Sequence, residues 1–266
     1  MSRNRLFLTL AMLCLVATFA APPTLAASPR GTAPQELAYG SDPLQRGDFW
    51  RGTQTAAPLV LFVHGGGWKR GDKAMMKSSA GLSHWQALGY AVASINYRLV
   101  PSATVEQQAQ DVADAVSALK REAGELGFDK SRIVLVGHSA GAHLVALVGT
   151  DPAYLRAAGL SYSDIAGIVL LDGASYDAAA QMDANPRLMG DTYRQAFGTD
   201  PERQHALSPT HHAAVPNAQA FLILHVQRRD GIAQAQGLAH ALEQAGTPVR
   251  IEGFAGRGLR GHAAIY

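Results

Sequence analysis

The chain has 266 residues, of which 47% are hydrophobic and 17% are charged, and its formal net charge is +2. This balance excludes a disordered chain, which would be poorer in apolar residues and richer in charge. A single cysteine excludes an intramolecular disulfide scaffold. The charge balance gives no support for nucleic acid as a partner. The length suits one large α/β domain or two small ones.

Residues 1–27 have the pattern of a secretory signal peptide. Arg3 and Arg5 precede an uncharged, mainly apolar run over residues 6–20, and two alanines end the segment. The run is shorter than the roughly 20 residues that a membrane-spanning helix needs, which disfavours a retained anchor. We therefore expect cleavage and export to the periplasm or the extracellular space. The mature part, residues 28–266, is expected to form a single domain.

Six short apolar runs bounded by glycine or proline predict strands that are buried on both faces of a sheet. They cover residues 58–63, 91–96, 132–136, 165–171, 220–226 and 248–252. Apolar residues at helical spacing predict helices over 105–121, 140–148 and 232–245. This alternation predicts an α/β fold with a mostly parallel central sheet flanked by helices.

Residues 173–217 interrupt the alternation of strands and helices. They contain four prolines and no clear strand. We expect this segment, called the excursion below, to form a small lid-like region over the site, with short helices near residues 188–197 and 201–207.

The sequence Gly137-His138-Ser139-Ala140-Gly141 follows a predicted strand and opens a predicted helix. A G-x-S-x-G motif in this position is typical of a nucleophile elbow, a tight turn that presents a serine hydroxyl at the carboxyl edge of a sheet. A free serine hydroxyl is a poor nucleophile, so the motif implies a base nearby. The alternative is a surface serine in a glycine-rich turn, which the flanking strand and helix disfavour.

A second glycine-rich motif, His64-Gly65-Gly66-Gly67-Trp68, follows the strand predicted at residues 58–63. Consecutive glycines allow backbone N–H groups to point at a carbonyl oxygen on which negative charge develops. The motif fits neither a phosphate-binding loop nor a dinucleotide fingerprint. His64 is expected to fix this loop, because it precedes the glycines and the catalytic base is expected late in the chain.

The two motifs together resemble the α/β-hydrolase superfamily, and within it the esterase/lipase branch of hormone-sensitive-lipase-like and kynurenine-formamidase-like bacterial carboxylesterases. The stretch GHSAGAHLVALVGTDPAYL, residues 137–155, is especially similar to small bacterial carboxylesterases. The resemblance implies the α/β-hydrolase fold and Ser139 as the nucleophile. It also implies an oxyanion hole formed by the backbone N–H groups of Gly66, Gly67 and Ala140.

The chain order in this superfamily is serine, acid, histidine. Asp230 follows the late strand at residues 220–226, and His262 follows the last predicted strand, so we expect Asp230 as the acid and His262 as the base. Asp172 is the competing acid, because it directly follows the strand predicted at 165–171. The resemblance leaves the position of Asp230 open, because Val226 stands where related proteins usually have a glycine.

These residues predict a serine carboxylesterase that hydrolyses small carboxylic esters through a Ser-His-Asp acyl-enzyme mechanism. The alternatives are an arylformamidase that cleaves N-formylkynurenine and a non-catalytic binding protein on the same fold. We expect a small-molecule ester as the partner, no cofactor and no metal. The adjacent His211 and His212 lack a further ligand at metal-binding spacing. The sequence does not indicate the acyl-chain length, the alcohol or the oligomeric state.

Overall fold

The computed structural model describes residues 33–184, 189–214 and 216–266. The segment Thr32–Tyr266 forms one compact unit. The predicted signal peptide, residues 1–27, lies outside the described residues.

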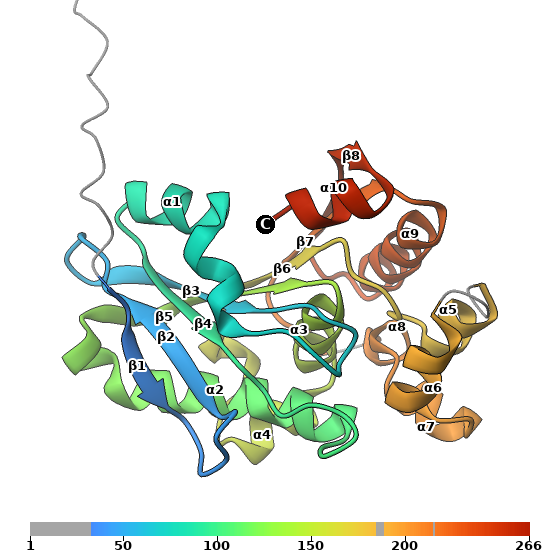
Figure 1. Ribbon diagram of the computed structural model, residues 1–266, viewed down its shortest axis with the longest axis horizontal. Helices are drawn as coiled ribbons and strands as arrows, with labels where there is room; N and C mark the ends of the chain where they lie inside the picture. Colours follow the sequence, from blue (N-terminus) through green and yellow to red (C-terminus); the bar gives the residue numbers. More distant parts are fainter. Residues whose placement is uncertain (1–32, 185–188, 215) are drawn as a thin grey trace, which may run out of the picture. The chain divides into compact units, whose positions relative to one another are not determined.

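An eight-stranded sheet forms the centre of this unit (Figure 1), in the order β1-β2-β4-β3-β5-β6-β7-β8. The pairs β1–β2 and β2–β4 are antiparallel, and every other pair of neighbours is parallel. The prediction of a mostly parallel sheet is therefore confirmed. The strands are β1 (Gln35–Ala38), β2 (Arg46–Trp50), β3 (Ala57–Val63), β4 (Ala91–Ile95), β5 (Phe128–His138), β6 (Gly167–Leu171), β7 (Phe221–Gln227) and β8 (Val249–Arg257).

The six predicted strands correspond to β3 through β8, whereas β1 and β2 were not predicted. Both lie at one edge of the sheet, and β1 is largely exposed. An edge strand needs no continuous apolar run, and the sequences QELA and RGDFW contain none. The signal on which the prediction relied is therefore absent from these two strands.

The long predicted helices are confirmed as α2 (Val105–Leu126), α3 (Ala140–Thr150) and α9 (Arg229–Gln244). Within its described residues, the excursion contains four short helices, in agreement with the prediction. No helix within the described ranges is long and apolar enough to cross a membrane. The remaining helices are α1 (Ala80–Ala87), α4 (Pro152–Ala157), α5 (Ala178–Ala184), α6 (Gly190–Phe197), α7 (Pro201–Ala206), α8 (Pro209–His212) and α10 (Gly258–Ala264), with 3₁₀ turns at Lys73–Ser78 and Tyr162–Asp164.

Both faces of the sheet are buried, which explains why its central strands are apolar throughout. Leu59 and Leu61 of β3 belong to a cluster that includes residues of α2, α3 and α9. Val60 and Phe62, which alternate with them, belong to a second cluster with Leu82 of α1 and residues near the end of the chain. Each fully buried side chain of this size contributes about 1.5–3 kcal/mol, so β3 stabilises both layers.

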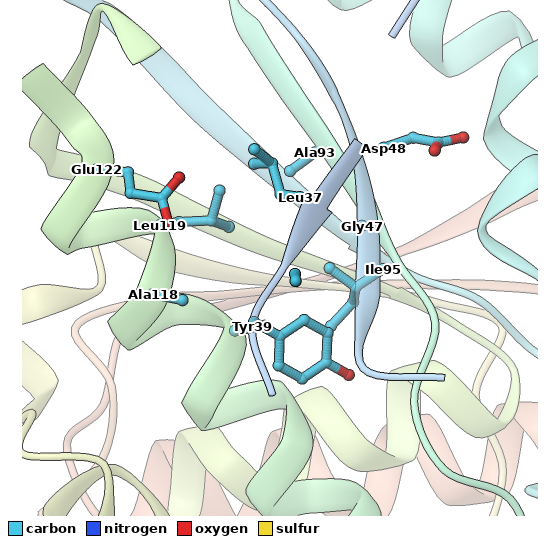
Figure 2. A pocket seen from close by; sticks show the side chains of 11 residues that line it. Leu37, Tyr39, Gly47, Asp48, Ala93, Ile95, Ala118, Leu119 and Glu122 are labelled. Carbon is cyan, nitrogen blue, oxygen red and sulfur yellow. The ribbon is translucent and has the colours of Figure 1, made fainter. Parts of the chain in front are cut away.

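A small cavity lies between β1, β2, β4 and α2, toward the opposite edge of the sheet from β8 (Figure 2). Leu37, Ile95 and Leu119 are among its mainly apolar lining residues. Its volume of about 10 Å³ is close to the minimum that holds a single water molecule. This cavity is too small for an ester substrate.

Candidate active site

Ser139 occupies a sharp turn between β5 and α3. Its φ of 55° and ψ of −117° are unusual for a residue other than glycine. The Ser139 N–H donates a hydrogen bond to Leu171 O on the neighbouring β6, at 3.0 Å. Strained backbone of this kind persists where the surrounding structure enforces it, and it occurs often at active sites. The structure therefore gives Ser139 the conformation that the nucleophile-elbow prediction requires.

The glycines of the G-x-S-x-G motif are required by close backbone packing. A Cβ atom on Gly137 would lie 2.3 Å from Gly141 O, and one on Gly141 would lie 2.2 Å from Val63 O. Neither position has room for a side chain. The motif thus holds α3 against the ends of β5 and β3 while Ser139 stays partly exposed.

The loop of residues 64–68 packs directly against the elbow. A Cβ atom on Gly65 would lie 2.9 Å from Ser139 Cβ, so the first glycine allows this close approach. Gly66 and Gly67 have φ values of 129° and 64°, in the region that glycine adopts readily. Among the described residues, no acceptor takes a hydrogen bond from the backbone N–H groups of Gly66, Gly67 or Ala140. These three N–H groups are the donors predicted for the oxyanion hole.

His64 is buried and stabilises the glycine loop. Its Nδ1 donates a hydrogen bond to Gly65 O at 2.7 Å, and its ring stacks on Tyr97 with centroids 4.4 Å apart. Tyr97 in turn donates its hydroxyl to His64 O at 3.0 Å. Burial lowers the pKa of His64, which favours the neutral form. These contacts give His64 the loop-fixing role that the sequence predicted.

Trp68 joins this loop to the excursion. Its indole Nε1 donates to His143 Nδ1 at 3.3 Å, and its ring packs edge-on against Phe197 of α6 at a centroid distance of 4.8 Å. His143 Nε2 donates to Leu207 O at 2.8 Å. Burial lowers the pKa of His143 to about 4, so this residue is a neutral structural link near neutral pH.

His262 lies on α10 and contacts Asp172 at the end of β6. Its Nδ1 donates a hydrogen bond to Asp172 Oδ2 at 2.6 Å. The other carboxylate oxygen, Oδ1, accepts the Val226 N–H at 3.1 Å. A proton held on Nδ1 leaves Nε2 of the neutral imidazole free to accept another proton. The Asp172–His262 pair therefore has the arrangement of an acid that orients a general base.

The structure differs from the prediction for Asp230, because Asp172 makes the contact that we expected of Asp230. Asp230 lies in the first turn of α9, where its Oδ2 accepts Gln181 Nε2 at 3.1 Å and contacts Arg228 Nη1 at 3.3 Å. β7 continues to Gln227, which leaves little loop before α9 to turn Asp230 toward His262.

Several groups hold Asp172 in its ionised form. Burial alone would raise the pKa of this carboxyl group. The hydrogen bond from His262, the positive charge of Arg228 and the Val226 N–H outweigh burial and hold the pKa below its ordinary value. Asp172 is thus a carboxylate at neutral pH, as the orientation of His262 requires.

His138, the variable residue of the elbow motif, supports the helix that carries His262. Its Nε2 donates to His262 O at 2.8 Å, and the two imidazole rings lie 4.5 Å apart. Burial and the neighbouring His262 lower the pKa of His138 to about 4, so it is neutral near pH 7. Sequence reasoning missed this role, because the motif places no constraint on its second residue.

The family comparison matches the model described as BD-FAE over residues 50–242. The chain belongs to the BD-FAE family. Among curated proteins, it is 36% identical over 126 residues to esterase LipC of Mycobacterium tuberculosis, covering 45% of this chain and 31% of LipC. It is 31% identical over 131 residues to isoprenylcysteine alpha-carbonyl methylesterase ICME of Arabidopsis thaliana, covering 48% of this chain and 30% of ICME. The chain therefore spans about a third of the length of these relatives.

Solved structures confirm the fold. Esterase B of Lactobacillus rhamnosis aligns with a TM-score of 0.70 and 22% identity, over 82% of this chain and 72% of that one. Thermogutta terrifontis esterase 2, phosphonylated by sarin, aligns with a TM-score of 0.69 and 21% identity, over 88% of this chain and 86% of that one. The expected α/β-hydrolase fold is thus confirmed.

Proposed function

We propose that this protein is a serine carboxylesterase that acts on small carboxylic esters. The observation that carries the proposal is the combination of a strained Ser139 elbow with an Asp172–His262 pair. β5 and β6 are parallel neighbours, so Ser139 and Asp172 follow the carboxyl ends of adjacent strands. The relatives named as esterases, and the family itself, support the same chemistry.

The proposed reaction has two halves. Ser139 Oγ attacks the ester carbonyl while His262 Nε2 accepts the hydroxyl proton, and Asp172 stabilises the resulting imidazolium. The backbone N–H groups of Gly66, Gly67 and Ala140 stabilise the oxyanion, and loss of one such donor typically costs about 3–4 kcal/mol. The imidazolium then gives its proton to the leaving alcohol, which forms the acyl-enzyme. Water, activated by His262, releases the carboxylic acid and regenerates Ser139.

The test combines turnover with covalent labelling. The wild-type protein should hydrolyse short p-nitrophenyl esters and react with a fluorophosphonate at the peptide that contains Ser139. Ser139→Ala should lose both properties, whereas Ser83→Ala, an exposed serine on α1, should keep both. A non-catalytic binding protein would not label at Ser139. Unchanged ester turnover in Ser139→Ala would overturn the proposal.

A substrate panel separates the ester from the amide alternative. We expect a higher kcat/KM for short-chain esters than for N-formylkynurenine. A preference for the formamide would favour the arylformamidase instead.

We also propose that residues 1–27 direct export and are removed, on the basis of their basic start and apolar run. N-terminal sequencing of protein recovered from outside the cytoplasm tests this, and an intact Met1 would contradict it.

A further inference from the structure

Arg228 lies between two carboxylates at the site. Its Nη2 is 3.4 Å from Asp172 Oδ2, the same oxygen that accepts the hydrogen bond from His262. Its Nη1 is 3.3 Å from Asp230 Oδ2. Nη2 also lies 3.4 Å from Gly173 O. One guanidinium group thus connects the proposed triad acid to the carboxylate that the sequence favours for that role.

The distances indicate an effect through charge more than through a tight hydrogen bond. Charge-assisted N–H···O bonds are usually about 2.7–2.9 Å long, and these contacts are longer. Coulomb attraction falls only with the inverse of distance, so the guanidinium still acts strongly on a buried carboxylate. Asp172 is fully buried at its side chain, and the Arg228 side chain is 22% exposed. Solvent screening of this pair is therefore limited.

Gly231 provides a second, independent observation about the space that the Arg228 side chain occupies. This glycine is the third residue of α9. A Cβ atom there would lie 3.0 Å from Arg228 Nη2 and 3.2 Å from Asp172 Oδ1. The missing side chain leaves the space through which Arg228 reaches Asp172. Gly237 in the same helix offers a matched comparison, because a Cβ atom there would have no described neighbour within 4 Å.

We propose that Arg228 is a positioning residue of the candidate active site, which holds Asp172 against His262 and balances the charge of Asp172 and Asp230. This inference rests on the proposed function. With Arg228 present, the three side chains carry one net negative charge, which the imidazolium formed during turnover neutralises. Without Arg228, two negative charges would remain, and His262 would hold its proton at a higher pH. Protonated His262 is unable to accept the Ser139 proton.

Two buried titratable side chains close to the Asp172–His262 pair are neutral near pH 7. His138 from β5 is neutral near pH 7, because burial and the neighbouring His262 lower its pKa to about 4. Burial raises the pKa of Tyr176, so its phenol is also neutral. The ring of Tyr266 lies 4.5 Å from that of His138.

The neighbouring arginines of α10 and β8 lie in solvent. Arg257 and Arg260 are both exposed, so water and salt screen their charges. Asp172 contacts His262 directly, and the charges of Arg228 and Asp230 are linked to it through Asp172.

The test uses two substitutions with opposite expected effects. Arg228→Gln should move the acidic limb of the kcat/KM–pH profile for p-nitrophenyl acetate upward by about one pH unit, and so lower kcat/KM by about tenfold at pH values well below the limb. Asp230→Asn should move the limb in the opposite direction, because it removes a negative charge. Arg228→Lys should restore most of the wild-type profile. An unmoved limb in Arg228→Gln, or a shift of both variants in the same direction, would overturn the proposal.

A second readout does not depend on ester turnover. NMR titration of the His262 ring should show its midpoint shifted upward in Arg228→Gln and downward in Asp230→Asn, whether or not the protein hydrolyses the chosen ester. Failure of the proposed function, seen as unchanged turnover in Ser139→Ala, is therefore distinguishable from failure of this inference.

Variants within α9 test whether Gly231 leaves the space that the Arg228 guanidinium occupies. Gly231→Ala should shift the profile in the direction of Arg228→Gln, because the added methyl group displaces the guanidinium. Gly237→Ala should keep the wild-type profile. Identical profiles for these two alanine variants would show that Gly231 does not leave needed space for Arg228. That result would contradict the second observation on which the proposal stands.

Discussion

Replacing Asp172 with asparagine tests which acid serves His262. The Nδ1–Oδ2 distance is 2.6 Å. An imidazolium and a carboxylate at this separation attract by about 6 kcal/mol at an effective dielectric constant of about 20. Each 1.36 kcal/mol of barrier corresponds to a tenfold change in rate, so kcat should fall by about 10⁴-fold. Serine-protease triads lose a similar factor on the same substitution.

The geometry also explains why asparagine is a poor substitute at this position. Both oxygens of Asp172 accept hydrogen bonds, Oδ2 from His262 and Oδ1 from the Val226 N–H. An amide NH₂ would face a donor in either orientation. If it faces His262, the imidazole has to hold its proton on Nε2, where it blocks acceptance of the Ser139 proton.

The assay compares steady-state kcat for p-nitrophenyl acetate in Asp172→Asn and Asp230→Asn, with thermal unfolding as a check that both variants fold. Asp230→Asn should retain kcat within about threefold at its own pH optimum, because Asp230 contacts Gln181 and Arg228, whereas Asp172 accepts the hydrogen bond from His262. A loss of about 10³-fold or more in Asp230→Asn, with Asp172→Asn nearly unaffected, would refute the assignment of Asp172.

Two further predictions concern stability. Gly141→Ala should destabilise the protein by about 3 kcal/mol in urea unfolding, because its Cβ would collide with backbone oxygens of Val63 and His64. Gly124→Ala, at an exposed and unobstructed position of α2, should instead stabilise the protein by up to about 1 kcal/mol. His143 has a folded pKa of about 4 against 6.5 when unfolded, so the unfolded chain binds a proton first as pH falls. Its contribution, about 3 kcal/mol, should therefore be lost between pH 6.5 and 4, and His143→Gln should flatten that slope.

The parts of the site that depend on local backbone geometry were predictable from the sequence. Gly137 and Gly141 flank Ser139 because the turn has no room for side chains, and Gly66 and Gly67 adopt positive φ values in the loop beside it. These constraints act over a few residues and leave a recognisable motif. The central strands were equally predictable, because burial on both faces demands continuous apolar runs.

The choice of acid was not predictable, because it depends on where two strands end in space. Asp172 has a φ of 42° directly after β6, which turns the chain at the point where it meets His262. The pairing of β7 with β8 shifts register between His225 and Gln227, and the chain then enters α9 with Asp230 in its first turn. A pattern of residue types gives no indication of such a shift.

The packing of Trp68 has a consequence for attempts to re-engineer specificity. Trp68 directly follows the glycines of the proposed oxyanion hole, and its indole ring packs against Tyr193 and Phe197 of α6. The excursion and the glycine loop are thus packed against each other through Trp68. An excursion transplanted from another hydrolase would have to bring aromatic partners of matching shape for Trp68. Without them, the graft would change the pocket and loosen the oxyanion donors together.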